Sequence, residues 1–498
     1  MPDSKEPVRR GASTDTWIVD GLRLALARRE ADTTLARCLY DALRGWIQSG
    51  ELAAGRSLPS SRRLARELGI GRNTALAALD HLGAEGFVDT RPGAGLYVAD
   101  IGFRRPTGAA ADRTSRSVGL SRRGQTLLAY SRGGQGNRGA FVPGVPALDA
   151  FPWAAWQRVL RRHRTRQRGR WLDYGAEGGH PALKAAIADY VTIARNVRCR
   201  ADQILITHGA QHAFDLIARM LSDPGDTAWV EEPGYAGARA AFTAAGLSLA
   251  PVTVDAHGLD PAAAKPESAR PKLIHLTPSN QFPMGVTLTM SRRQALLDLA
   301  RRHGAWIIED DYDSEFRYSS APLSSLQGLT DAGDGGAPVL YVGTFSKTLY
   351  PGLRLGYVVL PPSLVAPMRR ANVRQFREGD YIVQAALAAF MHEGGYAKHV
   401  ARMRRLYRQR QARLREALGP AAELMGGDAG LHVVLRLASQ DAERRLIEAA
   451  ATQGIALVPL SGYYAEAPAM AGLVLGYANA DETEIDRAGC WLRRELMG

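Results

Sequence analysis

The sequence predicts two domains: a small, mainly helical N-terminal domain that ends in a β-hairpin, and a larger α/β domain built on a mostly parallel sheet. The chain has 498 residues, and a single hydrophobic core rarely grows beyond roughly 250–300 residues. A basic, glycine-rich stretch over residues 101–140 interrupts the apolar patterning. After it, short apolar strand-like runs alternate with helical patterns, which is typical of a parallel sheet covered by helices.

Composition and charge exclude several classes of protein. Apolar residues make up 46% and charged residues 23% of the chain, as in ordinary globular proteins. No apolar run reaches about 18 residues, so the sequence predicts no membrane span, and the polar N-terminus has no apolar signal core. Cys38, Cys199 and Cys490 are too far apart for a metal site or a disulfide framework. We therefore expect a cytoplasmic protein without a metal site.

The N-terminal domain, expected over residues 20–100, contains three helical patterns followed by a hairpin pattern. The second and third helices are joined by the short turn Ile70-Gly71, and two helices joined in this way can place the second one in the major groove of DNA. The hairpin is typical of a wing. The predicted apolar faces consist of Leu35, Leu39, Leu43 and Ile47 in the first helix, Leu64 and Leu68 in the second, and Leu76, Leu79 and Leu82 in the third.

Polar residues occupy the positions from which such a domain reaches DNA. Arginine and asparagine at the start of the third helix can make bidentate contacts with guanine and adenine, and an arginine at the start of the second helix can reach a phosphate. Each is weak evidence alone, because a helical bundle without a DNA role also carries surface arginines. The residues predicted to contact DNA are Arg62, Arg72, Asn73 and Thr74 in the helices, and Arg91 and Gly93 in the wing.

Residues 101–140 are predicted to form a flexible linker. They contain eight arginines and eight glycines against one acid, Asp112, and a second run over residues 161–170 adds six arginines. These two stretches account for the net charge of +13. Such clusters attract polyanions, nucleic acid first, although a solvated basic surface explains either cluster as well. We expect the linker arginines to contact DNA phosphates; the alternative is a linker that docks on the second domain and reports its ligand state.

The second domain, over residues 141–498, is predicted to bind its ligand at the ends of five strands. In parallel sheets ligands bind beyond the carboxyl ends of the strands, so the polar residues after each apolar run are candidates for a site. The predicted strand runs are 203–207, 227–230, 272–276, 305–308 and 339–342.

The residues after these runs match the needs of pyridoxal 5'-phosphate (PLP). This cofactor requires a lysine for the aldimine, a carboxylate facing the pyridine nitrogen, a phosphate cup and a flat surface against the ring. Lys347 follows the last run, and Arg354 with the hydroxyls of Thr344 and Ser346 could bind the phosphate. A Ser-Lys pair means little alone, since most lysines are surface residues.

Three further features complete the pattern. Asp310 and Asp311 follow the run 305–308, and their spacing does not decide which of them faces the nitrogen. Gly209-Ala210-Gln211 opens a helix after the first run and can present free amides to a phosphate. Tyr235 follows the second run and can stack on the ring. The simpler interpretations are a solvated acidic loop, an ordinary turn and loop packing.

Longer motifs resemble two known families. The stretch from Leu35 to Asp100 closely resembles the winged helix-turn-helix of the GntR family, and residues 141–498 resemble fold-type I aminotransferases. IIEDDYDSEFRY and GTFSKTLYPGLRLGY are very similar to the MocR/GabR-type regulators, a GntR subfamily with one such fused domain. The resemblance implies a multidomain protein: a mainly α winged helix-turn-helix, then an α/β PLP-dependent aminotransferase-like domain with a large subdomain at about 175–375 and a small one at about 376–498.

The resemblance also assigns residues to the cofactor. It implies that Lys347 forms the aldimine, that Asp310 faces the pyridine nitrogen, and that Tyr312 meets the ring hydroxyl while Tyr235 lies on the ring. Tyr174 matches the tyrosine that reaches the neighbouring subunit's phosphate in aminotransferase dimers, which implies a head-to-tail homodimer. The residues implied for the phosphate are Gly209, Ala210, Gln211, Thr344, Ser346 and Arg354.

The sequence departs from the two families at three positions. Gly71 stands where a serine often precedes the recognition-helix arginine, which is expected to remove one phosphate contact. Phe282 stands where aminotransferases hold an asparagine that meets the ring, with Asn280 or Gln281 as substitutes. Val474 stands where they carry an arginine for the substrate carboxylate. Without that fork-shaped partner, efficient transamination is not expected.

Three functions fit these features. The first is a PLP-binding, DNA-binding transcription regulator whose second domain senses a small molecule (an amino acid, an amine or PLP itself) and controls operator binding. The second is an active aminotransferase that also binds DNA, which Val474 argues against. The third is a DNA-binding protein that has lost the cofactor and only dimerises, which the intact lysine, aspartate and phosphate residues argue against. We expect the first.

Overall fold

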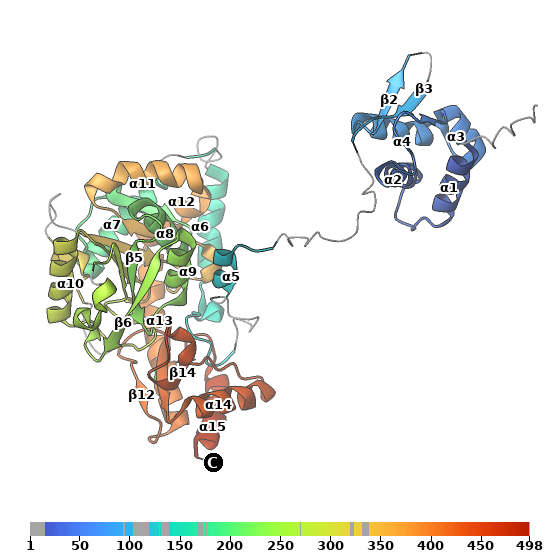
Figure 1. Ribbon diagram of the computed structural model, residues 1–498. Coiled ribbons are helices and arrows are strands. Elements are labelled where there is room, and N and C mark those ends of the chain that lie inside the picture. Colours follow the sequence, from blue (N-terminus) through green and yellow to red (C-terminus); the bar gives the residue numbers. More distant parts are fainter. Residues whose placement is uncertain are drawn as a thin grey trace, which may run out of the picture. The chain divides into compact units, whose positions relative to one another are not determined.

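The computed structural model describes residues 15–92, 95–102, 119–128, 130, 139–166, 173–175, 177–268, 270–318, 323–330 and 338–497. These residues belong to two compact units, Met1–Val118 and Gly119–Gly498 (Figure 1). Within the described ranges, no helix is long and apolar enough to cross a membrane.

The described part of the N-terminal unit consists of four helices and a three-stranded sheet. The three predicted helices and the hairpin are present, whereas the first helix and the first strand were not predicted. The sheet has the order β1-β3-β2. The elements are α1 (Asp15–Ala27), α2 (Leu35–Gln48), α3 (Ser61–Leu68), α4 (Arg72–Ala84), β1 (Ser57–Leu58), β2 (Val88–Arg91) and β3 (Gly95–Val98).

Local sequence explains where the two central helices begin and end. The Ser60 hydroxyl accepts a hydrogen bond from the Arg63 amide at 3.3 Å and so caps α3. Gly69 ends this helix in the left-handed conformation, with a φ of 68°. Gly71 precedes α4 and has no side chain with which to cap it. The replacement of serine by Gly71 therefore leaves the first turn of α4 without a side-chain cap.

One face of α4 packs into the core of this unit. Ala75, Ala78, Leu79 and Leu82 are buried at the helical spacing of an amphipathic helix. Leu76 is 38% exposed, so the prediction that Leu76 shares the apolar face of α4 is wrong. In α2 the predicted Leu39, Leu43 and Ile47 are buried, and Leu35 at the helix start is 38% exposed.

The second unit is organised around a mostly parallel sheet, as predicted. The sheet of the described residues has the order β4-β11-β10-β9-β8-β5-β6-β7. β11 is antiparallel to β10 and β4, and β7 is antiparallel to β6. All five predicted strands are present; β6, β7 and β11 were not predicted. The strands are β4 (Ile204–Thr207), β5 (Thr227–Glu232), β6 (Ser248–Asp255), β7 (Gly258–Leu259), β8 (Leu273–Leu276), β9 (Trp306–Asp311), β10 (Val339–Thr344) and β11 (Gly356–Val359).

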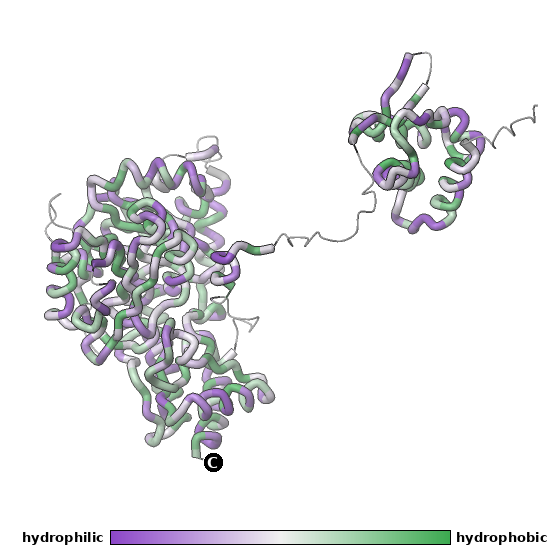
Figure 2. The backbone as a smooth tube through the Cα atoms, viewed as in Figure 1, coloured by the Kyte–Doolittle hydropathy of each residue, from purple (hydrophilic) through white to green (hydrophobic). Residues whose placement is uncertain are grey.

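Helices cover both faces of this sheet (Figure 1). Ile308 packs with α8, α9 and α11 on one face, whereas its neighbour Ile307 packs with α10 on the other, because successive strand residues point to opposite faces. Along the helices, hydrophilic and hydrophobic residues follow each other in short stretches, as amphipathic packing requires (Figure 2). The helices of this subdomain are α6 (Trp153–Arg166), α7 (Pro181–Arg195), α8 (Ala210–Leu221), α9 (Ala236–Ala245), α10 (Met290–His303), α11 (Pro362–Gln375) and α12 (Tyr381–His392).

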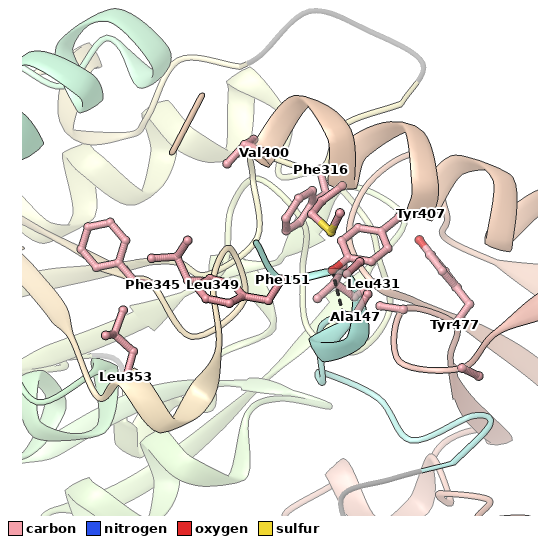
Figure 3. Close-up of a cluster of buried hydrophobic side chains, with 14 of the residues drawn as sticks. Ala147, Phe151, Phe316, Phe345, Leu349, Leu353, Val400, Tyr407, Leu431 and Tyr477 are labelled. Atoms are coloured by element: carbon pink, nitrogen blue, oxygen red, sulfur yellow. Dashed lines mark hydrogen bonds between the residues drawn. The ribbon is translucent and has the colours of Figure 1, made fainter. Parts of the chain in front are cut away.

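A smaller sheet of order β12-β13-β14 and the long helix α13 form the C-terminal part. A shared hydrophobic cluster joins it to the large sheet, and Phe316 and Tyr407 pack edge to face within it (Figure 3). The Ala147 amide donates to the Tyr407 hydroxyl at 2.9 Å. The elements are α13 (Gly395–Leu418), α14 (Gln440–Thr452), α15 (Glu482–Met497), β12 (Leu424–Met425), β13 (His432–Leu437) and β14 (Ala471–Gly476).

Part of the predicted linker is a packed helix. α5 (Arg122–Leu128) lies within residues 101–140 and contacts α9, so residues 122–128 are helical, whereas the flexibility of the linker stays a prediction. Arg122 and Arg123 are exposed on α5. Residues 103–118 and 131–138, which include Arg104 and Arg105, lie outside the described residues. That the linker arginines contact DNA phosphates stays a prediction.

The buried face of α4 gives a direct stability test. Leu82→Ala is expected to lower the free energy of unfolding of the N-terminal unit by about 2–5 kcal/mol, because it leaves a cavity in the core. Leu76→Ala, in the same helix, is expected to lower it by less, about 1 kcal/mol, because this residue is 38% exposed and lies outside the core cluster. Hydrogen exchange of the α2 and α4 amides, measured by mass spectrometry on the full chain, reports both values. Equal losses would contradict the assignment of the core-facing side.

Candidate functional site

A pocket of about 400 Å³, here called the central pocket, lies beyond the carboxyl ends of β4, β5, β9 and β10, the edge that the sequence predicted. Ten of the twelve predicted cofactor residues line it. They are Gly209, Ala210, Gln211, Tyr235, Asp310, Tyr312, Thr344, Ser346, Lys347 and Arg354.

Lys347 reaches the central pocket from the segment that follows β10. Its ammonium donates a hydrogen bond to the Gly144 carbonyl at 2.6 Å. Burial lowers the pKa of Lys347, and the nearby carboxylates of Asp313 and Asp310 oppose this effect. A lowered pKa increases the fraction of neutral amine, which is the nucleophilic form.

Asp310 presents a buried carboxylate to the same pocket. Its Oδ2 lies 3.5 Å from Nε2 of His275, which comes from the neighbouring strand β8. Its Oδ1 is buried and has no hydrogen-bond partner among the described residues. A buried carboxylate oxygen without a partner is costly, so this atom fits a ligand that brings an N–H donor into the central pocket.

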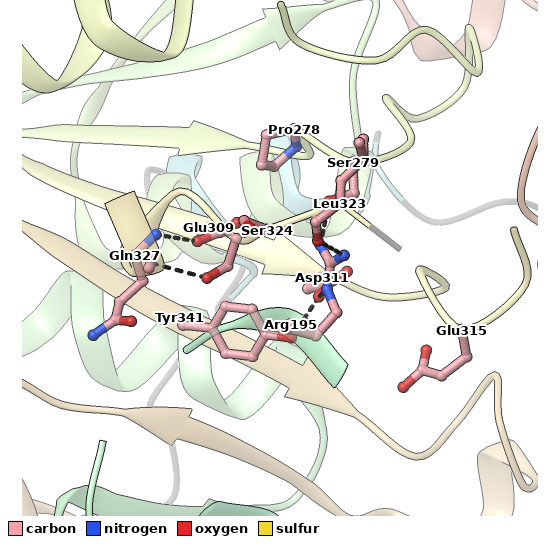
Figure 4. Close-up of polar contacts among 12 residues, drawn as sticks. Arg195, Pro278, Ser279, Glu309, Asp311, Glu315, Leu323, Ser324, Gln327 and Tyr341 are labelled. Carbon is pink, nitrogen blue, oxygen red and sulfur yellow. Dashed lines mark hydrogen bonds and ion pairs between the residues drawn. The ribbon is translucent and has the colours of Figure 1, made fainter. Parts of the chain in front are cut away.

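Asp311, the next residue, does not line the central pocket and lies beside Arg195 and Tyr341 (Figure 4). There its Oδ2 accepts from Nε of Arg195 at 2.7 Å, and both side chains are almost fully buried. The Tyr341 hydroxyl donates to the same carboxylate. Glu309, two residues earlier, accepts from the backbone amides that follow Ser325. Strand alternation therefore makes Asp310 the acid of the central pocket, a choice that sequence spacing left open.

Backbone amides, hydroxyls and one guanidinium form an anion-binding cup. Gly209 precedes α8 with a φ of 83°, a conformation that favours glycine, and the first amides of a helix lack acceptors within it. The Thr344 hydroxyl donates to Ser346 Oγ at 3.0 Å. Arg354 also lines the pocket, and a Cβ built on Gly209 would lie 3.8 Å from its Nη1. These groups have the charge and donors that a phosphate requires.

Aromatic rings form another wall, with Phe282 at its centre. The Phe282 ring centroid lies 5.9 Å from that of Tyr235, 5.8 Å from Tyr312 and 5.1 Å from Tyr463, all in edge-to-face orientation. The four side chains line the central pocket. Where aminotransferases hold an asparagine, this chain therefore presents an aromatic surface.

Asn280 does not line the central pocket. Its Nδ2 donates to the Tyr312 hydroxyl at 3.1 Å and to the Asp313 carboxylate at 3.0 Å, and the Tyr312 hydroxyl donates to the Asn280 carbonyl at 3.0 Å. The Gln281 amide donates to Pro233 O instead. Asn280 therefore hydrogen-bonds to Tyr312, which lines the pocket, and does not line the pocket itself. Its predicted contact with the cofactor stays a prediction.

Val474 and Tyr174 also lie outside the central pocket. Val474 is fully buried in β14, in an apolar cluster that contains Tyr463. Among the described residues that line the pocket, the cationic side chains are those of Lys347 and Arg354. Tyr174 is 72% exposed and lies under the Arg377 guanidinium, 5.0 Å from its ring centroid. Its predicted role in a neighbouring subunit stays a prediction.

Several pocket residues were not predicted. Gly144, whose carbonyl accepts from Lys347, carries no side chain that could have marked it in the sequence. Tyr463 comes from a segment about 120 residues after the nearest predicted strand run. Tyr130 was not predicted because it lies within residues 101–140, which the sequence predicts to be a linker. Phe282 could have been found, since its departure from the aminotransferase pattern was visible.

In the N-terminal unit, most residues predicted to contact DNA are accessible. Arg62, Arg72 and Asn73 are exposed at the starts of α3 and α4, and Thr74 is partly buried. Arg91 in the hairpin is exposed and lies over the Tyr97 ring, 4.4 Å from its centroid. Gly93 lies outside the described residues. The start of α4 therefore presents polar side chains to solvent, as a recognition helix must.

Comparison with known families matches both units. Residues 35–98 match the bacterial regulatory proteins of the gntR family, and residues 148–488 match aminotransferase class I and II. The probable rhizopine catabolism regulatory protein MocR of Rhizobium meliloti is 40% identical over 91% of this chain and 92% of its own length. The pyridoxine biosynthesis transcriptional regulator PdxR of Corynebacterium glutamicum is 32% identical over 90% of this chain and 93% of its own.

Solved aminotransferases share the fold of the second unit. A kynurenine aminotransferase of Pyrococcus horikoshii, solved with PMP, has a TM-score of 0.66 and 25% identity and covers 78% of this chain and 96% of its own. LysN of Thermus thermophilus, an α-aminoadipate aminotransferase complexed with N-(5'-phosphopyridoxyl)-L-leucine, has a TM-score of 0.64 and 28% identity over 76% of this chain and 95% of its own. The chain therefore belongs to the MocR-type transcription regulators, in which a GntR-family helix-turn-helix domain precedes an aminotransferase class I and II domain.

Proposed function

We propose that this chain binds PLP in the central pocket, senses a small molecule there, and controls transcription through operator binding by its N-terminal unit. The observation that carries the proposal is the buried Oδ1 of Asp310, which has no hydrogen-bond partner in the described part of the chain and lies in the pocket that also contains Lys347 and the anion-binding cup. A pyridine nitrogen that is protonated would satisfy this oxygen. As a bacterial regulator of DNA, the protein is expected in the cytoplasm.

The chain's residues fit the parts of PLP. Lys347 would carry the cofactor covalently, Asp310 would hold its ring nitrogen, and Tyr312 its ring hydroxyl. Burial raises the pKa of Tyr312 well above its usual value, so this phenol stays protonated; its single proton, donated to the Asn280 carbonyl in this structure, would turn to the cofactor. Tyr235 would lie against the ring, and the cup would bind the phosphate with Arg354 as its cation. When bound, PLP supplies an electron sink for bonds at an attached amine.

Sensing rather than turnover is supported by the wall of the pocket. Val474 replaces the expected arginine and is buried, so β14 supplies no guanidinium for a substrate carboxylate. The relatives named above are regulators, and we infer that the effector is an amino acid, an amine or PLP itself. We further propose a head-to-tail homodimer in which Tyr174 reaches the phosphate of the neighbouring subunit, because this side chain is exposed and away from its own pocket.

Lys347→Ala tests the covalent attachment. We expect the visible absorption of lysine-bound PLP to disappear, because no other lysine lines the central pocket among the described residues. Lys398→Ala is the matched control, since Lys398 is exposed on α13. Circular dichroism should show that both variants fold. An unchanged absorption spectrum in Lys347→Ala would overturn the assignment.

Asp310→Asn and Asp311→Asn separate the two faces of β9. Asp310→Asn removes a charge-assisted hydrogen bond worth about 1.5–3 kcal/mol, so PLP should bind about 10- to 150-fold more weakly. Asp311→Asn leaves Arg195 buried without its carboxylate, which is expected to cost about 3–5 kcal/mol of stability while the folded protein still binds PLP. Equilibrium dialysis and urea unfolding measure the two effects. The opposite outcome, with Asp311 governing affinity, would reverse the assignment of the pocket acid.

Arg72→Ala tests the recognition helix. Loss of one bidentate base contact costs about 1–3 kcal/mol, so binding to an operator selected with the wild-type chain should weaken about 5- to 150-fold. Arg62→Ala should weaken binding to selected and random DNA alike, because a phosphate contact carries no sequence information. Fluorescence anisotropy with both DNAs distinguishes these effects. If Arg72→Ala keeps its preference for the selected sequence, α4 does not read the bases.

A further inference from the structure

α5 attaches to the aminotransferase-type unit through α9. The two helices are in contact, and Leu127 of α5 lines the same surface hollow as Ala240, Ala241 and Ala244 of α9. Alanines along one side of a helix let a neighbouring helix approach closely. In the sequence, α5 comes directly before Tyr130 and directly after the stretch that leads back to the N-terminal unit.

Tyr130 extends from this attachment into the wall of the central pocket. Its hydroxyl lies 3.5 Å from the Thr243 hydroxyl of α9, where either group could donate. Its ring centroid lies 5.9 Å from Cζ of Arg239, also on α9. Tyr130 is partly buried. These two contacts with α9 therefore position the Tyr130 ring at the central pocket, although Tyr130 does not belong to the sheet.

Arg239 links Tyr130 to the aromatic wall. This arginine is 2% exposed, and its Nη1 donates to the Tyr463 carbonyl at 2.8 Å. The Tyr463 ring packs in turn against Phe282. One buried guanidinium thus lies between two pocket-lining tyrosines that are more than 300 residues apart in the sequence. None of the groups assigned to the cofactor requires Tyr130.

We propose that Tyr130 is a specificity-determining residue that contacts the part of a ligand extending beyond the cofactor, and that ligand binding holds α5 against α9. The proposal rests on the proposed function. Because the neighbouring wall consists of Phe282 and Tyr463, this part of the ligand is apolar or aromatic. Ligand binding in the central pocket would thereby stabilise the contact of α5 with α9. In the sequence, α5 follows the segment that leads from the DNA-binding unit.

N-(5'-phosphopyridoxyl)-L-leucine, the conjugate bound by the relative LysN, is a suitable probe. It fills the cofactor position and adds an apolar side chain, whereas PLP fills the cofactor position alone. With the full chain freed of cofactor, Tyr130→Ala should weaken binding of the conjugate about two- to tenfold, the range for one aromatic contact. PLP binding should change by less than about twofold. Tyr130→Phe keeps the ring and should bind the conjugate as the wild type does.

Hydrogen exchange tests the second half of the proposal. The conjugate should slow exchange of the Arg122–Leu128 amides more than PLP does, and Tyr130→Ala should remove this difference. Arg122→Ala is the matched control on the exposed side of α5 and should behave as the wild type in both measurements.

The outcomes separate the two proposals. If neither PLP nor the conjugate binds the wild type, the proposed function fails. If both bind and Tyr130→Ala weakens neither or both equally, the role of Tyr130 is overturned while the proposed function stands. If the conjugate protects α5 no more than PLP does, the link between ligand and helix is overturned.

Discussion

The last two residues of β9 point to opposite faces of the sheet, and the architecture of the site depends on this alternation. On one face, Asp311 is fixed by its buried ion pair with Arg195 and by the Tyr341 hydroxyl. On the other face, Asp310 lines the central pocket beside His275, and its Oδ1 has no partner among the residues that the structure describes. A slip of one residue in this strand would turn Asp310 away from the pocket and put a neighbouring acid, Glu309 or Asp311, in its place.

Arg195 contributes position more than net stability. Desolvation of two buried charges largely offsets their attraction, so a buried ion pair is weak evidence of stabilisation. However, the guanidinium of Arg195 reaches three separate segments, because it also donates to Ser279 Oγ and to the Leu323 carbonyl. The Ser279 segment leads directly to Phe282. One side chain from α7 therefore sets the relative positions of the strand end that carries Asp310 and the loop that carries the aromatic wall.

The sequence predicted those elements and residues whose place follows from hydrophobic periodicity or from the end of a strand. It did not predict those whose place depends on tertiary contacts. The five strand runs and Lys347 could be predicted because a buried parallel strand is continuously apolar and its ligands follow its carboxyl end. The choice between Asp310 and Asp311 needed the strand's orientation, which no spacing contains. α5 was not predicted because its sequence, RRGQTLL, has only two apolar residues beside its arginines and glycine. Its position is set by the contact with α9, which the sequence pattern does not contain. The prediction that Leu76 faces the core was wrong because α4 places Ala75 and Ala78 there, beside Leu79 and Leu82.

In the function proposed here, cofactor and ligand would be recognised by different parts of this chain. The groups assigned to PLP follow strand ends and are held by the rigid sheet, whereas the wall beyond them comes from Tyr130, Phe282 and Tyr463, which are distant in sequence. An enzyme must bind its transition state more strongly than its substrate, which demands charged groups aimed at the reacting atoms. A sensor needs only ground-state binding that differs between two states of the protein. The buried Val474, where a substrate-binding arginine was expected, together with the retained cofactor groups, is therefore consistent with the proposed sensor rather than with an efficient transaminase.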